Sequence, residues 1–262
     1  MQFGVGIRTG FLKRRLVKAV TLAAVACWGS LQGTAAGAVS ENNPTSQMVD
    51  SGSFGVFTNG KRVATETFSI HQSSLGSSVT SEFKSEAGTD KAAQSSELQL
   101  TGTGELKSYE WKESSPGQSQ AIVVPNQDFL IERFTNRPEE KQHEQPFLLP
   151  PSTSILDDYF FVQREVLAWK YLATSCRQEK GQVECPLKQN TQMGTINAHS
   201  HTSAPVTLQF SGREKISLHG VERELIRLDM KSESGDWSLW LDDQLKLQRI
   251  LNPAEGMEVV RD

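Results

Sequence analysis

The chain has 262 residues, of which 37% are hydrophobic and 22% are charged. This composition is typical of a globular protein and excludes both a collagen-like chain and a wholly disordered one. The 27 basic and 31 acidic residues give a formal net charge of −4, and the length suits one domain or two small ones.

The N-terminal segment, residues 1–38, has the pattern of a secretory signal peptide. It carries five basic residues and no acid, followed by the apolar run 19–28 and by Ala36-Gly37-Ala38. The apolar run is too short to cross a bilayer as a helix. We therefore predict export to the periplasm or out of the cell, with cleavage after Ala38.

Two alternatives for this segment stay open. One is an uncleaved N-terminal anchor. The other is a lipoprotein cut before Cys27, although Ala24-Val25-Ala26 is a poor form of the box that precedes a lipid-bearing cysteine. Removing the five basic residues of the peptide leaves 22 basic and 31 acidic residues, a net charge of −9. That charge argues against binding to nucleic acid and against docking on anionic lipid by charge alone.

The mature chain is predicted to comprise a flexible leader, residues 39–52, and a β-rich domain, residues 53–262. The leader is polar and lacks periodicity. From Phe54 onward, short alternating segments recur about every ten residues between turn residues, and Asn59-Gly60 is a hairpin signature. Such a series predicts an antiparallel meander. Residues 135–152 are expected to form a long surface loop.

One strong helix is predicted after this loop. Ser154 can cap it, Asp157 favours its N-terminal end, and apolar side chains cover most of its circumference as far as Leu172. A helix this apolar must be covered by other elements. Because strands resume after it, the sequence predicts a mainly β fold: a curved antiparallel sheet or open barrel with one long helix packed across it.

Two cysteines remain after cleavage, Cys176 and Cys185. Their spacing predicts a hairpin held at its base by a disulfide, as suits an exported protein. Closing so short a loop stabilises a fold by roughly 2–3 kcal/mol. A metal pair is less consistent with the sequence, because there is no second C-x-x-C and no nearby histidine.

Three segments carry a resemblance to known proteins. The run from Trp237 to Val260, the hairpin 55–67 and the helix 151–169 resemble uncharacterised exported bacterial proteins, the periplasmic domains of unknown function. The likeness spans most of residues 53–262. It implies a curved sheet or open barrel partly closed by a helix, a shape similar to that of the periplasmic lipoprotein carriers, which bind acyl chains between sheet and helix. The resemblance implies no site residue, and the cysteine hairpin is not part of the carrier pattern.

Catalytic patterns are missing from the sequence: it contains no G-x-S-x-G, no H-E-x-x-H, no P-loop and no G-x-G-x-x-G. His199 and His201 would face the same side of a strand and could share a metal, with His219 as a third ligand. H-x-H is short and common, however, so solvated histidines are the expectation. We predict no metal, no cofactor and no enzymatic activity. A hydrolase would require a His–acid–Ser cluster in a cleft.

Large aromatic side chains are the richest feature of the mature chain. The candidates for a ligand pocket are Trp111, Phe160, Phe161, Trp169, Trp237 and Trp240. These residues either fill the core or line an apolar cavity between sheet and helix. The leading hypothesis is a non-enzymatic envelope protein that binds lipid or another apolar or amphipathic ligand in a sheet–helix groove. The alternative is a structural or protein-interaction module of the envelope, with edge strands and residues 135–152 as contact surfaces.

Overall fold

The computed structural model describes residues 45–86, 91–179, 182–187, 189–233 and 235–262. All of these belong to one compact unit, Asn42–Asp262. The predicted signal peptide with Cys27, and the leader residues 39–44, lie outside the described residues. Within the described part of the chain, no helix is long and apolar enough to span a membrane.

Strands make up most of the described chain. The first eight are β1 (Gln47–Thr58), β2 (Lys61–Ser73), β3 (Gly76–Ser85), β4 (Ala93–Thr101), β5 (Leu106–Ser115), β6 (Gln120–Asn126), β7 (Phe129–Thr135) and β8 (His143–Phe147). The next elements are β9 (Ser154–Ile155), helix α1 (Val162–Ser175), β10 (Arg177–Glu179), β11 (Gln182–Glu184) and β12 (Asn190–Asn197). The chain ends with β13 (Thr202–Leu218), β14 (Val221–Ser232), β15 (Gly235–Leu241), β16 (Leu247–Asn252) and β17 (Met257–Arg261).

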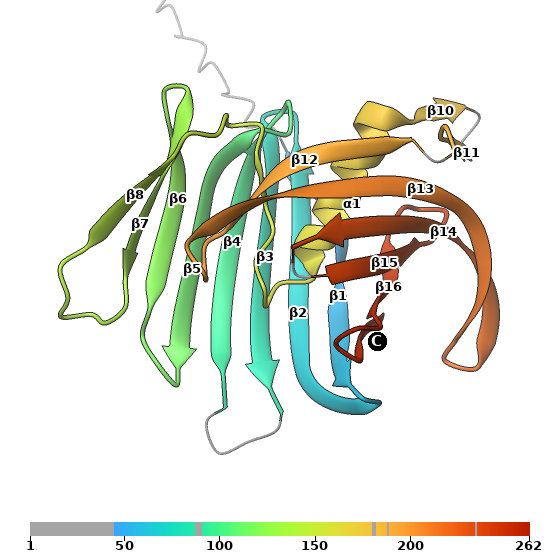
Figure 1. The fold of residues 1–262 in the computed structure, drawn as a ribbon, viewed down its shortest axis with the longest axis horizontal. Coiled ribbons are helices and arrows are strands. Elements are labelled where there is room, and N and C mark those ends of the chain that lie inside the picture. The colour runs from blue at the N-terminus through green and yellow to red at the C-terminus, as the bar shows by residue number, and fades with distance from the viewer. Residues whose placement is uncertain (1–44, 87–90, 180–181, 188, 234) are drawn as a thin grey trace, which may run out of the picture. The chain divides into compact units, whose positions relative to one another are not determined.

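Fifteen of these strands form one sheet, in the order β8-β7-β6-β5-β4-β3-β2-β1-β17-β16-β15-β14-β13-β12-β9, and β10 pairs separately with β11. The sheet is therefore two meanders that meet where β1 pairs antiparallel with β17. The short β9 pairs in parallel with β12. Figure 1 shows the sheet curving, with α1 between its blue–green strands and its orange–red strands. The prediction of a mainly β fold with a curved antiparallel sheet and one helix packed across it is confirmed.

The period-two pattern of each strand decides which side chains face the helix. On β2, Ala64, Glu66, Phe68 and Ile70 are buried, and the residues between them are more exposed. This alternation is the ordinary consequence of strand geometry, in which successive side chains point to opposite faces. One of the inward positions is a glutamate, and it determines where the helix begins.

The helix begins at Val162, so the prediction of a start at Ser154 is wrong. Ser154 lies in β9, where it pairs with Thr195 of β12. The first backbone N–H groups of a helix need acceptors, and Glu66 supplies one from the sheet. Its carboxylate accepts the N–H of Phe161 at 2.7 Å and that of Val162 at 3.3 Å. A capping group from 95 residues away in the sequence leaves no local signal.

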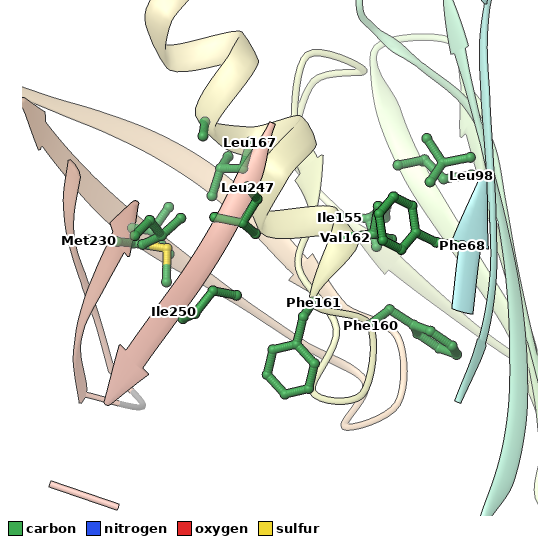
Figure 2. Packing of buried hydrophobic residues seen from close by; sticks show 14 of the residues in the cluster. Phe68, Leu98, Ile155, Phe160, Phe161, Val162, Leu167, Met230, Leu247 and Ile250 are labelled. Carbon is green, nitrogen blue, oxygen red and sulfur yellow. The ribbon is translucent and has the colours of Figure 1, made fainter. Parts of the chain in front are cut away.

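Other elements cover most of the helix, while its last turn is exposed at Ala173 and Thr174. Figure 2 shows Ile155 and Val162 on the side of Phe68, and Leu167 on the side of Leu247. All five belong to one hydrophobic cluster. Polar residues of the helix are enclosed as well: Gln163, Arg164 and Glu165 are 1%, 4% and 0% exposed. The segment is thus held by strands on both sides of it in the sequence.

Two strands extend into regions predicted to lack regular structure. β1 begins at Gln47, six residues before the expected domain start at Ser53, because residues 47–52 pair with β2 and because Asp50 is buried against Arg261. Within the predicted loop 135–152, β8 pairs with β7 from Leu130↔Phe147 to Phe134↔His143. Polar composition concealed both segments, since each exposes most of its side chains.

The disulfide between Cys176 and Cys185 is confirmed, and it closes the β10–β11 hairpin directly after α1. Replacing both cysteines with serine is expected to lower the free energy of unfolding by about 2–3 kcal/mol, because the closed loop is short. Urea denaturation of the two proteins without reductant measures the difference. Identical transition midpoints would show that the bridge contributes nothing to stability.

Candidate functional site

A cavity of about 510 Å3 lies between helix α1 and strands β2, β3 and β4. This volume falls in the range of roughly 300–1,000 Å3 that small-molecule pockets occupy. We call it the α1 cavity. Its apolar wall consists of Leu98, Leu100, Ile155, Val166, Leu167 and Trp169. A further concavity of about 410 Å3 on β2–β5 is lined mainly by serine, threonine and glutamate side chains.

Helix and strand periodicity place the apolar wall. Val166, Trp169, Lys170 and Ala173 recur three and four residues apart, so they share the side of α1 that faces the cavity. Leu98 and Leu100 are two residues apart on β4 and extend the wall along the sheet. The helical spacing was readable in the sequence, but the pairing of this side of the helix with β4 was not.

A close backbone approach forms part of the cavity lining at the start of β3. Gly76 has φ +148°, and a Cβ added there would lie 2.0 Å from the carbonyl oxygen of Leu100. Only glycine fits such an approach without displacing the neighbouring strand. Gly76 therefore allows β3 and β4 to meet at the cavity lining, to which both residues belong.

Trp169 is the aromatic residue of the cavity wall. Its indole Nε1 donates a hydrogen bond to the carbonyl oxygen of Leu245 at 2.6 Å. The ring is consequently fixed at one end by the loop between β15 and β16 while another part of the same side chain lines the cavity. This combination of a polar edge and an apolar body is typical of tryptophan at ligand sites.

Lys170 is the one charged side chain among the described residues that line the cavity. Its Nζ donates hydrogen bonds to the carbonyl oxygen of Ser152 and, at 3.3 Å, to Oγ of Ser154. Burial lowers the pKa of Lys170 below its ordinary value. Both acceptors of the Lys170 ammonium group are neutral oxygens. Among the described residues, no carboxylate forms an ion pair with Lys170.

The structure separates the six aromatic candidates. Trp169 lines the α1 cavity, whereas Phe160 and Phe161 are buried in the core, 0% and 2% exposed, at the N-terminal end of the helix. Trp237 stacks on Arg164, whose guanidinium carbon lies 4.6 Å from the ring centre. Trp111 donates a hydrogen bond from Nε1 to Gln94 within the sheet. These four side chains belong to the main hydrophobic core and do not line the cavity.

Trp240 lies in a separate cluster. It packs with Ile216, Leu218 and Leu225, apart from the cluster that holds the helix. Its Nε1 donates to Glu214 at 3.0 Å. The neighbouring Leu239 and Leu241 belong to the main core, so strand alternation puts Trp240 on the other face of the sheet.

The histidine pair lies in a turn. His199 and His201 are in the connection between β12 and β13, and His201 has φ +55°. His219 is at the β13–β14 turn, where its Nε2 contacts the carbonyl oxygen of Arg261. The three histidines therefore do not converge. No group of three metal-binding side chains occurs among the residues that the structure describes.

Each histidine of the pair faces a carboxylate. His201 Nδ1 lies 3.0 Å from Oε1 of Glu132 on β7, and His199 Nδ1 lies 3.5 Å from Oδ2 of Asp158. The ring of His199 meets Trp111 and Tyr159 edge-on, at centroid distances of 5.2 and 4.8 Å. His199 thus has an acid partner and two aromatic neighbours, and no contact with a serine hydroxyl is seen in the described chain.

His201 joins the two ends of the curved sheet. Its carbonyl oxygen accepts a hydrogen bond from Nε2 of Gln145 on β8, and its ring stacks on Phe134 of β7 at 3.7 Å. Burial and, as the smaller cause, the charge of Asp157 together raise the pKa of Glu132 to about 8. The sequence analysis did not identify Glu132. Its position between the apolar run 129–131 and Phe134 was a signal that the acid is buried and has a partner.

A second buried polar cluster holds the loop before α1. Oδ2 of Asp157 accepts the hydroxyl proton of Tyr109 at 3.0 Å, and Nε2 of Gln163 donates to the same hydroxyl oxygen at 3.1 Å. The amide N–H of Asp157 donates to Oε1 of Gln163 at 2.6 Å. Since these groups satisfy one another, the cluster orients the entry to the helix. The acid predicted to favour the helix end acts instead through the side chain of Tyr109.

Comparisons with known proteins support the fold. No protein-family model matches the chain, and a search of curated proteins also finds no match. Among solved structures, the chain is similar to a β-barrel-like protein of a domain of unknown function, DUF1849, from Brucella abortus. The TM-score is 0.52 at 7% identity, over 81% of this chain and 94% of the other. The likeness shows a shared fold and agrees with the predicted resemblance to domains of unknown function.

Proposed function

We propose that this protein is a non-enzymatic envelope protein that binds lipid, or a similar amphipathic ligand, in the α1 cavity. The observation that carries the proposal is the cavity itself: about 510 Å3 between sheet and helix, with Leu98, Ile155 and Leu167 on its walls. Apolar surface left uncovered inside a fold is unfavourable in water. Burying an alkyl chain there would remove that surface from solvent.

The compartment follows from different observations. The Cys176–Cys185 disulfide indicates an oxidising, extracytoplasmic environment. The signal-peptide pattern of residues 1–38 agrees with export. We infer a periplasmic or secreted location from these two observations.

Filling the cavity tests the proposal. Ala173 lines the cavity at its solvent-exposed end, and replacing it with phenylalanine is expected to weaken binding of a fluorescent fatty acid at least tenfold, because the ring obstructs the opening through which the chain enters. The matched control is Ala254→Phe in the exposed β16–β17 turn, which should bind as the wild type does. Titration of each protein with the probe gives the dissociation constants. Failure of the wild type to bind the probe, together with native mass spectra free of lipid, would refute the proposal.

A protein partner is the second candidate function, and the sheet edge favours it. β8 is the terminal strand of the sheet, and Leu148, the residue after it, is 89% exposed. An open strand edge followed by an apolar side chain is suited to pairing with an added strand. Pull-down from envelope extracts with the wild type and with Leu148→Glu tests this. A partner captured reproducibly by the first protein and lost by the second would support the interaction module.

A further inference from the structure

The lining of the α1 cavity changes character along its length. Leu98 and Leu167 are buried, 3% and 1% exposed, and mark an apolar inner part. Gly102, Thr103 and Thr174 also line the cavity but are exposed, so they mark the part that meets solvent. A ligand that matches this lining has an apolar end and a polar end.

The size of the cavity limits the apolar end. At roughly 30 Å3 for a group the size of one water molecule, the volume of about 510 Å3 holds on the order of 15 such groups. A methylene group is similar in size, so the cavity suits one alkyl chain.

The charge of the lining residues indicates the chemistry of the ligand's polar end. Lys170 is half-buried in the cavity wall, and its hydrogen-bond acceptors, Ser152 and Ser154, are uncharged. The negative charge of Glu105 raises the pKa of Lys170, but the two side chains form no ion pair. An ammonium group close to apolar surface is stabilised when it donates charge-assisted hydrogen bonds to an anion. The site provides one cation and no carboxylate of its own among the described lining residues.

We infer that the ligand of the α1 cavity is an anionic single-chain amphiphile, with its alkyl chain between α1 and β4 and its carboxylate or phosphate on Lys170. This inference rests on the proposed function and specifies its ligand class. A free fatty acid and a single-chain phospholipid share this chemistry.

The experiment compares three probes with the same chain: laurate, dodecyl phosphate and dodecanol. Isothermal titration of the full folded protein is expected to show binding of at least one anion about tenfold tighter than binding of the alcohol, as one charge-assisted hydrogen bond provides. The tighter of the two anions distinguishes a carboxylate from a phosphate source.

Lys170 variants show whether this residue is responsible. Lys170→Met keeps the length of the side chain and is expected to bind the tighter anion and dodecanol equally, while Lys170→Arg keeps the preference. The control Lys61→Met alters an exposed lysine at the start of β2 and should leave the preference unchanged. Equal urea midpoints establish that the variants are folded.

The outcomes separate the inference from the proposed function. Equal binding of anions and alcohol by the wild type overturns the anionic ligand class and leaves the lipid-binding cavity standing. A preference that persists in Lys170→Met overturns the assignment to Lys170. Absence of binding by all three probes refutes the proposed function itself.

Discussion

Replacing Arg261 with methionine is expected to lower the free energy of unfolding by about 3–5 kcal/mol, the range for breaking a buried ion pair from one side. Arg261 Nη2 lies 2.6 Å from Oδ2 of Asp50 and 3.1 Å from Oε2 of Glu165. The side chains of both acids are almost completely buried, 1% and 0% exposed. Without the guanidinium, Glu165 would lose its ion pair, while Asp50 would keep the one with Lys246, whose Nζ lies 3.1 Å from Oδ1 of Asp50.

The network connects the sheet centre to the helix. Arg261 is on β17, Asp50 on β1 and Glu165 on α1, and the guanidinium also lies over the rings of Phe54 and Phe68. Burial alone would raise the pKa of Asp50, but hydrogen bonds from Arg261 and other partners hold it below its ordinary value. Loss of Arg261 removes the group that contributes most to this lowering.

Urea denaturation followed by tryptophan fluorescence measures the effect. Adding Glu165→Gln to Arg261→Met should recover part of the lost stability, because it removes the acid that has lost its ion pair with Arg261. Arg133→Met is the control: its ion pair with Glu144 is 40% and 55% exposed, so the loss should stay below about 1 kcal/mol. An equally small loss for Arg261→Met would show that the network does not stabilise the fold.

The stability of the protein is expected to fall as the pH rises from about 5 to about 8. Burial raises the pKa of Glu132 to about 8, that of Glu66 to about 7 and that of Asp157 to about 6. In an unfolded chain these carboxyl groups titrate near pH 4. Between the two values the folded protein holds protons that the unfolded chain has released, so a rise in pH favours unfolding.

Among these three groups, Glu132 is expected to contribute most, because its pKa lies furthest above its ordinary value. At about 1.4 kcal/mol for each pKa unit, its share between pH 5 and pH 8 is on the order of 3 kcal/mol. His201 works in the opposite sense: burial lowers its pKa, so its contribution to stability grows as the pH rises towards 6.5. Its ring is 25% exposed, which keeps this opposing effect smaller.

The variant Glu132→Gln tests the assignment. Glutamine keeps a donor for His201 Nδ1 but does not titrate, so the fall in stability between pH 5 and pH 8 should shrink by about the share of Glu132. Urea midpoints at four pH values measure the slope, and Glu82→Gln, an exposed residue of β3, is the control. A wild type that becomes more stable towards pH 8 would contradict the expectation.

Local pattern was sufficient where neighbours in sequence are neighbours in space. The turn at Asn59-Gly60, the hairpin closed by Cys176 and Cys185, and the apolar helix all follow from short-range spacing. The β8 strand and the early start of β1 escaped because their exposed polar side chains resemble those of a loop. These strands are held by backbone hydrogen bonds to β2 and β7. The residue types of one strand do not show which other strand it pairs with.

The sequence by itself determined the class of fold, the site of the disulfide and the need for the helix to be covered, since each depends on the period or spacing of one segment. Only the tertiary structure decided which side of the helix faces the cavity, that Trp169 and Lys170 line it, and that Glu66 caps the helix from β2. The physical reason is distance along the chain. The contact between Glu66 and Val162 joins residues 96 positions apart. A pattern within one short segment cannot predict a contact over that separation.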